Sequence, residues 1–336
     1  MKRKIIKQGH NAFTITLPNE WVQNMNLKPK DEIDLIEDGN QLVINSKKNN
    51  EFNSVSFDIS NLSIPLIWKY FSTIYREGYD EIVITFSDAY KRYENAYSYS
   101  AAYRKDKLIS EDKKSLFLTI QDIVNRFIGM EIIEFNNKEC IVRQMEEPSD
   151  KQFESSVKRI FFILDQFFQD LLIAVKTDDL RNLKETHTID TNLDRFHDFC
   201  CRILSKTGCK SPHKSQLIFT TLYMLELLGD EFKAISDCLL KKDYQKERKN
   251  LERFSETIYE QFKKYTEIYN KFEHKKVKEI YETSSNLFQK YPELLVKNKK
   301  QEIFYHLIKI SEFLYYLAEL RLEEEYYNLA ISKNKN

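Results

Sequence analysis

Apolar and polar residues alternate near the start of the chain. Phe13, Ile15 and Leu17 are separated by two threonines, which is the period of a half-buried strand. Pro18 suits the start of a short helix, because the N–H that proline lacks would be unsatisfied at that position. The order predicted over residues 1–46 is strand, strand, helix, strand, strand, with turns at Gly9-His10-Asn11 and Asp38-Gly39-Asn40.

The pattern of residues 54–147 predicts a small α/β domain, after a polar linker at 46–53. It contains no motif for chemistry, and a spacer or dimer support is favoured over a small-molecule sensor. Residues 89–106 are rich in Tyr and Lys and are expected to form a helix or an ordered loop. Helices are expected at 65–77 and 114–126, and strands at 55–59, 81–86, 132–135 and 139–143.

Helical spacing dominates the remainder of the chain, from 149 to 336. Pro148 cannot continue a helix, and Ser149 can cap the one that follows. Long helices with short links favour antiparallel neighbours, and six of them suggest two three-helix bundles. The expected helices lie near 150–176, 178–208, 212–242, 244–272, 274–290 and 298–332, with a break at Tyr291-Pro292. The predicted fold class is multidomain α+β, with domains at 1–46, 54–147 and 149–336.

Composition narrows the functional class. The 336 residues include 52 Lys and Arg and 52 Asp and Glu, so only a local charge cluster can attract a polyanion. No apolar run reaches the roughly 18 residues of a membrane span, and five scattered cysteines fit reduced thiols. We therefore expect a cytoplasmic protein without membrane insertion. No P-loop, GxSxG, HExxH or GxGxxG motif is present, so we predict no enzyme activity and no catalytic residue.

The first domain has a local charge cluster of this kind. Lys2, Arg3, Lys4 and Lys7 precede the first turn, and no acid occurs before Glu20. Such a basic strand end is typical of a polyanion site. A segment of this length is too short to bury a core alone, and it has no cysteine or metal motif. A partner chain is therefore expected.

This segment resembles the AbrB/MazE/SpoVT swapped-hairpin DNA-binding domain. The resemblance rests on the basic first strand, on 14–21 (TITLPNEW), on 27–33 (LKPKDEI) and on 39–44 (GNQLVI). It implies that two chains exchange hairpins to form one dimeric barrel and that the first strands lie on DNA. The DNA-binding residues it suggests are Lys2, Arg3, Lys4, Lys7, Gln8, His10, Asn11 and Thr14. The alternative is a hairpin that serves only for dimerisation.

Carboxylates stand out in the helical region. Asp190, Asp194 and Asp198 are spaced by four residues and share one helix face. Glu226 and Asp230 share a face of the next helix, where the apolar surroundings of Glu226 should desolvate it. Two such pairs on adjacent helices can supply oxygen ligands to a cation. The alternative for the three aspartates is a solvated face that is salt-bridged to Arg195 or Arg202. Gly229 indicates a close backbone approach.

The two pairs resemble the metal motifs of the PhoU family. Asp190-x-x-x-Asp194 corresponds to the first motif, with Asp in place of the more usual Glu, and 226–230 (ELLGD) corresponds to the second. The resemblance implies two symmetric three-helix bundles, multinuclear metal clusters and regulation of phosphate uptake. In the second bundle the candidates Glu279-x-x-x-Thr283 and Glu312-x-x-x-Tyr316 each lack the second acid, so that bundle is read as structural. One site for a divalent or iron ion is expected, formed by Asp190, Asp194, Glu226 and Asp230.

The leading hypothesis is a homodimeric DNA-binding transcription regulator of phosphate uptake. One alternative is an adaptor that binds a phosphate transporter or sensor protein and uses the first domain only to dimerise. A third interpretation is an antitoxin-like protein, although such a protein would not need the long helical region. A zinc site is disfavoured against core or surface thiols, because no second pair completes a familiar spacing among His197, Cys200, Cys201 and Cys209.

Overall fold

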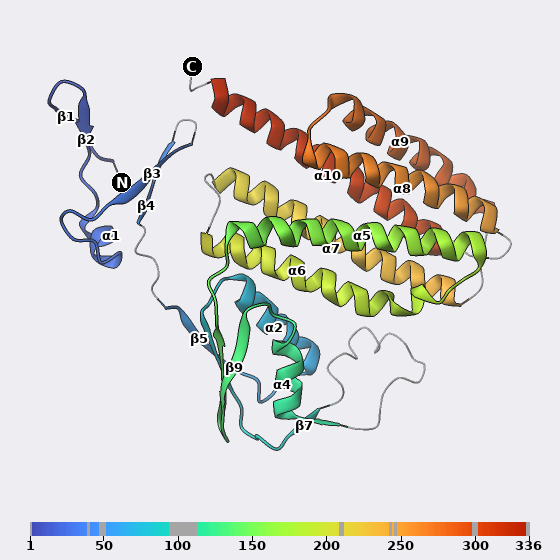
Figure 1. The fold of residues 1–336 in the computed structure, drawn as a ribbon, viewed down its shortest axis with the longest axis horizontal. Helices are drawn as coiled ribbons and strands as arrows, with labels where there is room; N and C mark the ends of the chain where they lie inside the picture. Colours follow the sequence, from blue (N-terminus) through green and yellow to red (C-terminus); the bar gives the residue numbers. More distant parts are fainter. Residues whose placement is uncertain are drawn as a thin grey trace. The chain divides into compact units, whose positions relative to one another are not determined.

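The protein is described by a computed structural model in which the chain forms two compact units, Met1–Asn53 and Ser54–Asn336 (Figure 1). The structure describes residues 2–38, 41–46, 52–93, 113–207, 212–241, 244, 247–297 and 302–333. The second unit contains both the α/β segment and the long helices. The predicted division at 1–46, 54–147 and 149–336 stays a prediction.

The first unit has the predicted order of elements. Its strands form two separate antiparallel pairs, and the described residues contain no closed barrel. Gly39, Asn40 and 47–51 lie outside the described residues, and so do the turn predicted at Asp38-Gly39-Asn40 and most of the predicted linker. The elements are β1 (Ile6–Gln8), β2 (Ala12–Thr14), α1 (Asn19–Asn24), β3 (Ile33–Asp38) and β4 (Gln41–Ser46).

The second unit begins with a four-stranded sheet in the order β5-β6-β10-β9. Strands β5 (Ser54–Asp58) and β6 (Glu81–Thr85) are parallel and are joined through helix α2 (Ile64–Arg76). Strands β9 (Met130–Phe135) and β10 (Glu139–Gln144) form the predicted hairpin, and α4 (Leu116–Val124) precedes them. These predictions are confirmed. We call residues 54–147 the α/β layer.

The segment predicted at 89–106 is only partly described. Its described part ends in a two-residue strand, β7 (Arg92–Tyr93), which pairs with β8 (Lys114–Ser115). No helix occurs over 89–93, and residues 94–106 lie outside the described part of the chain. A long-range pairing with β8 therefore determines the structure of 92–93, and local sequence pattern does not reveal such a pairing.

Six long helices follow, as predicted. Ser149 caps the first of them in a capping box with Gln152. Helices α5, α6 and α7 contact one another, as do α8, α9 and α10, and the two sets meet through α7 with α10 and α5 with α8 (Figure 1). Their bounds are α5 (Asp150–Thr177), α6 (Thr186–Thr207), α7 (Pro212–Leu240), α8 (Arg248–Asn270), α9 (His274–Lys297) and α10 (Glu302–Lys333).

Two boundaries differ from the prediction. Asp178 takes a left-handed conformation after α5, and a 3-10 turn, η1 (Asn182–Glu185), precedes α6, so the helix expected from 178 begins only at 186. Helix α9 continues through the expected break at Tyr291-Pro292. Proline removes one backbone hydrogen bond at a cost of about 3 kcal/mol, and the packing of Ile280 and Leu287 in the core can offset this cost.

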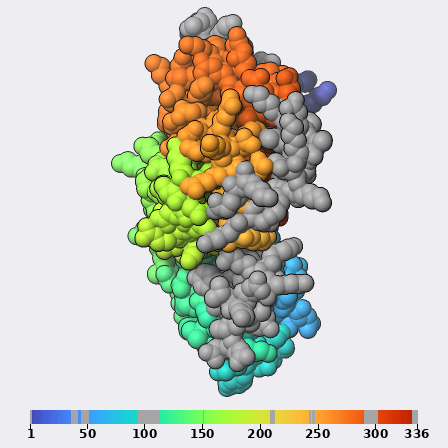
Figure 2. Space-filling view, turned by 90° about the vertical axis from the view of Figure 1, so that its right-hand side faces the viewer, coloured from blue at the N-terminus to red at the C-terminus, as the bar shows by residue number. Residues whose placement is uncertain are grey.

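The helices share one hydrophobic core, and the α/β layer has another. The second core includes Phe199 and Ile203 of α6, so this helix packs into both cores. In the space-filling view, the cyan and green side chains of the layer adjoin the yellow-green side chains of the helices (Figure 2). No helix in the described parts of the chain is long and apolar enough to cross a membrane.

Arg202 of α6 is buried at this junction, with 1% of its surface exposed. Its Nη1 and Nη2 donate to the carbonyls of Tyr75 and Tyr79, each at 2.8 Å, and Nη2 also donates to Gln144. The guanidinium lies over the Tyr75 ring at 4.8 Å. One α6 side chain therefore satisfies backbone groups at the end of α2 and a side chain of β10.

Replacing Arg202 with alanine is expected to destabilise the second unit strongly. The variant removes the hydrogen bonds from the buried guanidinium to the carbonyls of Tyr75 and Tyr79 and to Gln144, and it leaves a cavity beside the Tyr75 ring. The free energy of unfolding should fall by roughly 3 kcal/mol or more. Arg181→Ala is the matched control, because the Arg181 side chain is 86% exposed and its loss should change stability by about 0.5 kcal/mol or less. Equal unfolding free energies for the two variants in urea titrations would contradict this role.

Candidate nucleic-acid interface and carboxylate pocket

The basic residues predicted to bind DNA lie on or before the β1–β2 hairpin. Gly9 makes the turn with a φ of +74°, a conformation that glycine adopts at low cost. Thr14 donates from Oγ1 to the carbonyl of Ile6 at 3.4 Å, across the pair. All eight predicted residues are exposed: Lys2, Arg3, Lys4, Lys7, Gln8, His10, Asn11 and Thr14. Within the described chain, none of the four basic side chains forms an ion pair.

The hairpin divides these residues between its two faces. Lys7 lies opposite Phe13, while Gln8 lies opposite Ala12 and Thr14 lies opposite Ile6. Directly paired residues share a face, and neighbouring residues along a strand do not. Gln8 and Thr14 therefore lie on one face and Lys7 on the other, so this single hairpin cannot present all three to one flat surface.

The described residues of the first unit form no buried core of their own. No side chain described within Met1–Asn53 is buried. Ile5 and Phe13 are each 69% exposed, and Leu35 is 59% exposed. Burying such side chains is worth roughly 1.5 to 3 kcal/mol each, and here that stabilisation is not realised within one chain. The arrangement fits a unit that is completed by a second copy.

In the second unit, the four predicted metal ligands line one cavity of about 800 Å³. Asp190 and Asp194 come from α6, and Glu226 and Asp230 come from α7. The same cavity is lined by Trp68 of α2 and by four cations, Lys69, Arg126, Arg195 and Lys233. The α/β layer thus forms one wall and the helices form the other.

The three aspartates of α6 do not form a solvent-exposed helix face, which was the alternative interpretation. Asp190 and Asp198 are each 3% exposed. Their cations are also not those suggested by the sequence: Arg126 pairs with Asp194 at 2.7 Å, and Arg76 pairs with Asp198 at 3.5 Å. That alternative is wrong because α2 and the segment after α4 pack over α6 and bring their own arginines.

Lys233 joins the two carboxylate motifs. Its Nζ lies 2.7 Å from Asp190 Oδ2 and 2.5 Å from Asp230 Oδ1, which bridges α6 and α7. The other oxygen of Asp190, Oδ1, is buried and has no hydrogen-bond partner in the described residues. Glu226 forms no ion pair there. Lys233 therefore neutralises part of the acidic cluster and leaves oxygen donors unused.

Gly229 makes room for the Asp190 carboxylate. A Cβ at position 229 would lie 2.8 Å from Asp190 Oδ1 and 3.2 Å from Leu193 Cδ1. The close approach expected at this glycine is thus present, and the group that approaches is a carboxylate of the cluster. Oxygen donors crowded in this way suit a hard cation, so the residues fit the expected metal ion.

Burial also changes the acidity of the cluster. It raises the pKa of Glu226 to about 7, and the charges of Asp230 and Asp194 act in the same direction. Burial, followed by the charge of Asp194, raises the pKa of Asp190 as well. Part of the cluster is therefore protonated near neutral pH unless a cation compensates its charge.

The second set of helices has neutral polar contacts in its interior. Gln261 donates to Ser284 at 2.6 Å, and Ser311 donates to Gln261 at 2.8 Å, all three buried. Glu279 pairs with Lys264 at 2.9 Å. The structural role expected for this set stays a prediction.

The histidine and cysteines considered for zinc are only partly brought together. His197 Nε2 lies 3.5 Å from Cys201 Sγ, and Cys200 is buried near the Phe153 carbonyl. Cys209 lies outside the described residues. The interpretation of these cysteines as ordinary thiols stays a prediction.

Sequence reasoning missed several functional candidates. Lys233 could have been found, because it lies three residues after Asp230 and seven after Glu226 on one helical face. Arg126 and Trp68 carry no such signal, since they reach the cavity from the α/β layer. A cluster of Cys238, Glu302 and His306 was also missed, although Glu302 and His306 have helical i, i+4 spacing.

The comparisons with known proteins concern the first unit. Residues 6–52 match the family model of MazE, described as antidote-toxin recognition MazE, bacterial antitoxin. This match supports an AbrB/MazE-type domain. It also supports the broad class of DNA-binding or antitoxin-like regulators for the chain. Comparisons with curated proteins and with solved structures found no match.

The raised carboxyl pKa values predict a pH-dependent stability of the metal-free protein. The pKa of Glu226 is 4.5 in the unfolded chain and about 7 in the folded chain. Between these pH values the folded chain therefore keeps a proton on Glu226 that the unfolded chain has lost. The free energy of unfolding should therefore fall as pH rises through this window, by up to roughly 3 kcal/mol from this group.

Urea titrations at several pH values check this dependence. Glu226→Gln should flatten the decline, whereas Glu279→Gln should leave it unchanged, because its salt bridge and hydrogen bond with Lys264 lower the pKa of Glu279. Identical slopes for the wild type and Glu226→Gln would show that Glu226 does not carry the proton.

Proposed function

We propose that the protein is a cytoplasmic, homodimeric DNA-binding transcription regulator that controls phosphate uptake. The MazE-type match over residues 6–52 carries the DNA-binding part of this proposal. Lys2, Arg3, Lys4 and Lys7 support it, because they are exposed and form no ion pair with the described residues. Such cations displace counterions from DNA phosphates. Gln8, His10, Asn11 and Thr14 would reach base edges or backbone.

The phosphate-uptake part rests on the helical region. Its support is the convergence of Asp190, Asp194, Glu226 and Asp230 on one cavity, as the PhoU resemblance implies. A divalent or iron ion held there would be bound by the carboxylate oxygens that Lys233 leaves unused. The α/β layer forms the opposite wall of this cavity. Ion binding would therefore change the interactions of both the α/β layer and the helices.

An antitoxin-like regulator is the second candidate, and the description of the matched family favours it. In that case a toxin protein would be the partner of the chain. The large helical region, with its own acidic cavity, is not needed for such a role. We therefore keep the DNA-binding regulator of phosphate uptake as the main proposal and treat toxin binding as the competitor.

The double variant Arg3→Ala with Lys4→Ala tests the DNA-binding proposal. It should lose DNA affinity by about tenfold or more, and the slope of log affinity against log salt should fall by about two. The dimer should persist, because these side chains are exposed and unpaired. Lys28→Ala with Lys30→Asn is the matched control, since it removes the same charge and Asn tolerates the φ of 84° at position 30.

Gel-shift or fluorescence titrations over a salt series measure both quantities. Wild-type protein that binds no DNA at low salt would overturn the proposal. Equal DNA affinity of the wild type and the Arg3/Lys4 variant would also count against this interface. Wild-type protein that fails to bind DNA but remains dimeric would favour the adaptor that docks on a phosphate transporter or sensor protein.

The metal proposal has a separate test. Chelator-treated full-length protein is titrated with Mn²⁺ by calorimetry, beside the variant Glu226→Gln with Asp230→Asn. The wild type should bind the ion and the variant should bind it at least tenfold more weakly. The matched control is Glu279→Gln with Glu282→Gln, which removes two carboxylates from α9. Equal binding by the wild type and the Glu226/Asp230 variant would leave the four acids with a structural role only.

A further inference from the structure

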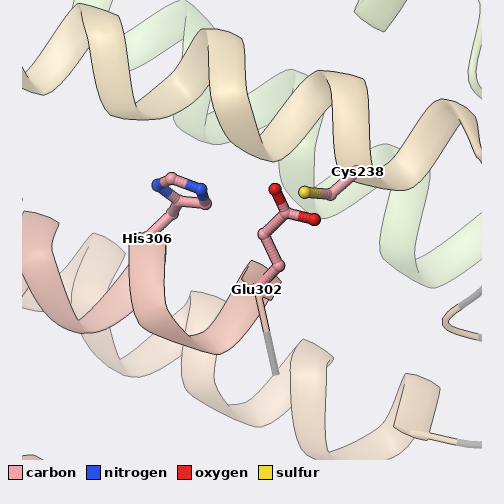
Figure 3. A group of neighbouring side chains, drawn as sticks. All are labelled: Cys238, Glu302 and His306. Atoms are coloured by element: carbon pink, nitrogen blue, oxygen red, sulfur yellow. The ribbon is translucent and has the colours of Figure 1, made fainter. Parts of the chain in front are cut away.

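A second group of metal-binding side chains lies where α7 contacts α10. Cys238 belongs to α7, and Glu302 and His306 belong to α10. One donor atom from each lies within 4.8 Å of the other two. Figure 3 shows the Glu302 carboxylate between the Cys238 sulfur and the His306 ring. None of the three lines the carboxylate pocket.

Helical spacing explains how two elements supply three ligands. Glu302 and His306 are four residues apart, so they project from the same face of α10. That face packs against α7, which provides Cys238. Zinc bonds of about 2.0 to 2.3 Å place tetrahedral donor atoms about 3.5 Å apart. The donor atoms of the three side chains, which lie within 4.8 Å of one another, are therefore close to this spacing.

The donor chemistry differs from that of the carboxylate pocket. A thiolate, an imidazole and a carboxylate together suit zinc, whereas oxygen donors alone suit Mg²⁺, Ca²⁺ or Mn²⁺. Cys238 would bind zinc as its thiolate, and the thiol proton would be released on binding.

Glu231 supplies an independent observation. It lies two turns before Cys238 on α7, and its Oε2 lies 2.6 Å from His306 Nδ1. This contact leaves the other ring nitrogen, Nε2, as a donor atom, and in Figure 3 one ring nitrogen faces Glu302. A carboxylate on the far nitrogen of a ligand histidine is a recurrent feature of zinc sites, because it fixes the ring and its tautomer. Lys309 Nζ lies 3.9 Å from the other oxygen of Glu231, and its positive charge balances that of the carboxylate.

We propose that Cys238, Glu302 and His306 bind a zinc ion, with Glu231 as the positioning residue of His306. Three protein ligands leave a fourth position for water or for a further donor. The ion would link α7 to the first residue of α10. It would thereby stabilise the junction between the two sets of helices. This site is independent of the proposed DNA and phosphate functions.

The experiment compares full-length variants stripped of metal and titrated with Zn²⁺ and Co²⁺. The wild type should bind one Zn²⁺ at this site, and its Co²⁺ complex should show a thiolate-to-cobalt charge-transfer band. Cys238→Ser should abolish that band, and His306→Ala should weaken Zn²⁺ binding at least a hundredfold. Glu231→Gln should weaken binding by about tenfold to a hundredfold while keeping the band.

Matched controls separate this site from the rest of the chain. His274→Ala removes a histidine at the start of α9, and Glu226→Gln with Asp230→Asn disables the carboxylate pocket; both should keep the Zn²⁺ affinity and the cobalt band. Glu302→Gln provides a second ligand variant at an exposed position, in case His306→Ala fails to fold. Unchanged Zn²⁺ binding in Cys238→Ser and Glu302→Gln, or a cobalt complex without a sulfur band, would overturn the proposal.

Discussion

The exposure of apolar side chains in the first unit is the constraint on which the proposed function depends. Ile5, Phe13 and Leu35 lie at the surface, and no described side chain of Met1–Asn53 is buried. Folding a segment of this size must offset about 1 to 2 kcal/mol of backbone entropy per residue. Isolated two-stranded hairpins do not supply this free energy. A second copy can do so by covering the apolar side chains, which also brings two basic hairpins into one assembly.

The second unit, in contrast, has two hydrophobic cores, and helix α6 takes part in both. Phe199 and Ile203 enter the core of the α/β layer, while Leu193 and Cys200 enter the core of the helices. The same helix carries the aspartates of the carboxylate pocket, and Arg126 of the layer pairs with one of them. A shift of the layer against α6 would therefore alter the pocket. This connection offers a physical route from ion binding to a change elsewhere in the unit.

Local patterns predicted most of the elements, and tertiary contacts explain the failures. Alternation located β2 and β5, a continuous apolar run located β6, and the Ser149 cap located the start of α5. The i, i+4 carboxylates and Gly229 led to the pocket, because helical spacing fixes which residues share a face. The arginines that pair with Asp194 and Asp198 come from 68 or more residues earlier in the chain, and the Cys238 cluster joins two helices that a single sequence cannot place side by side. Helix α9 continues through Pro292, which the local sequence pattern had indicated as a break.

The most direct test of the central claim is the mass of the full-length protein in solution, measured by sedimentation equilibrium at micromolar concentration. The account predicts twice the chain mass for the wild type. It predicts the single-chain mass for Phe13→Glu with Leu35→Glu, whose added charges would oppose burial between two copies. Tyr90→Glu with Tyr326→Glu, at two exposed aromatics of the second unit, should remain dimeric. A wild-type protein that sediments as a single chain, with its first unit folded, would contradict the account.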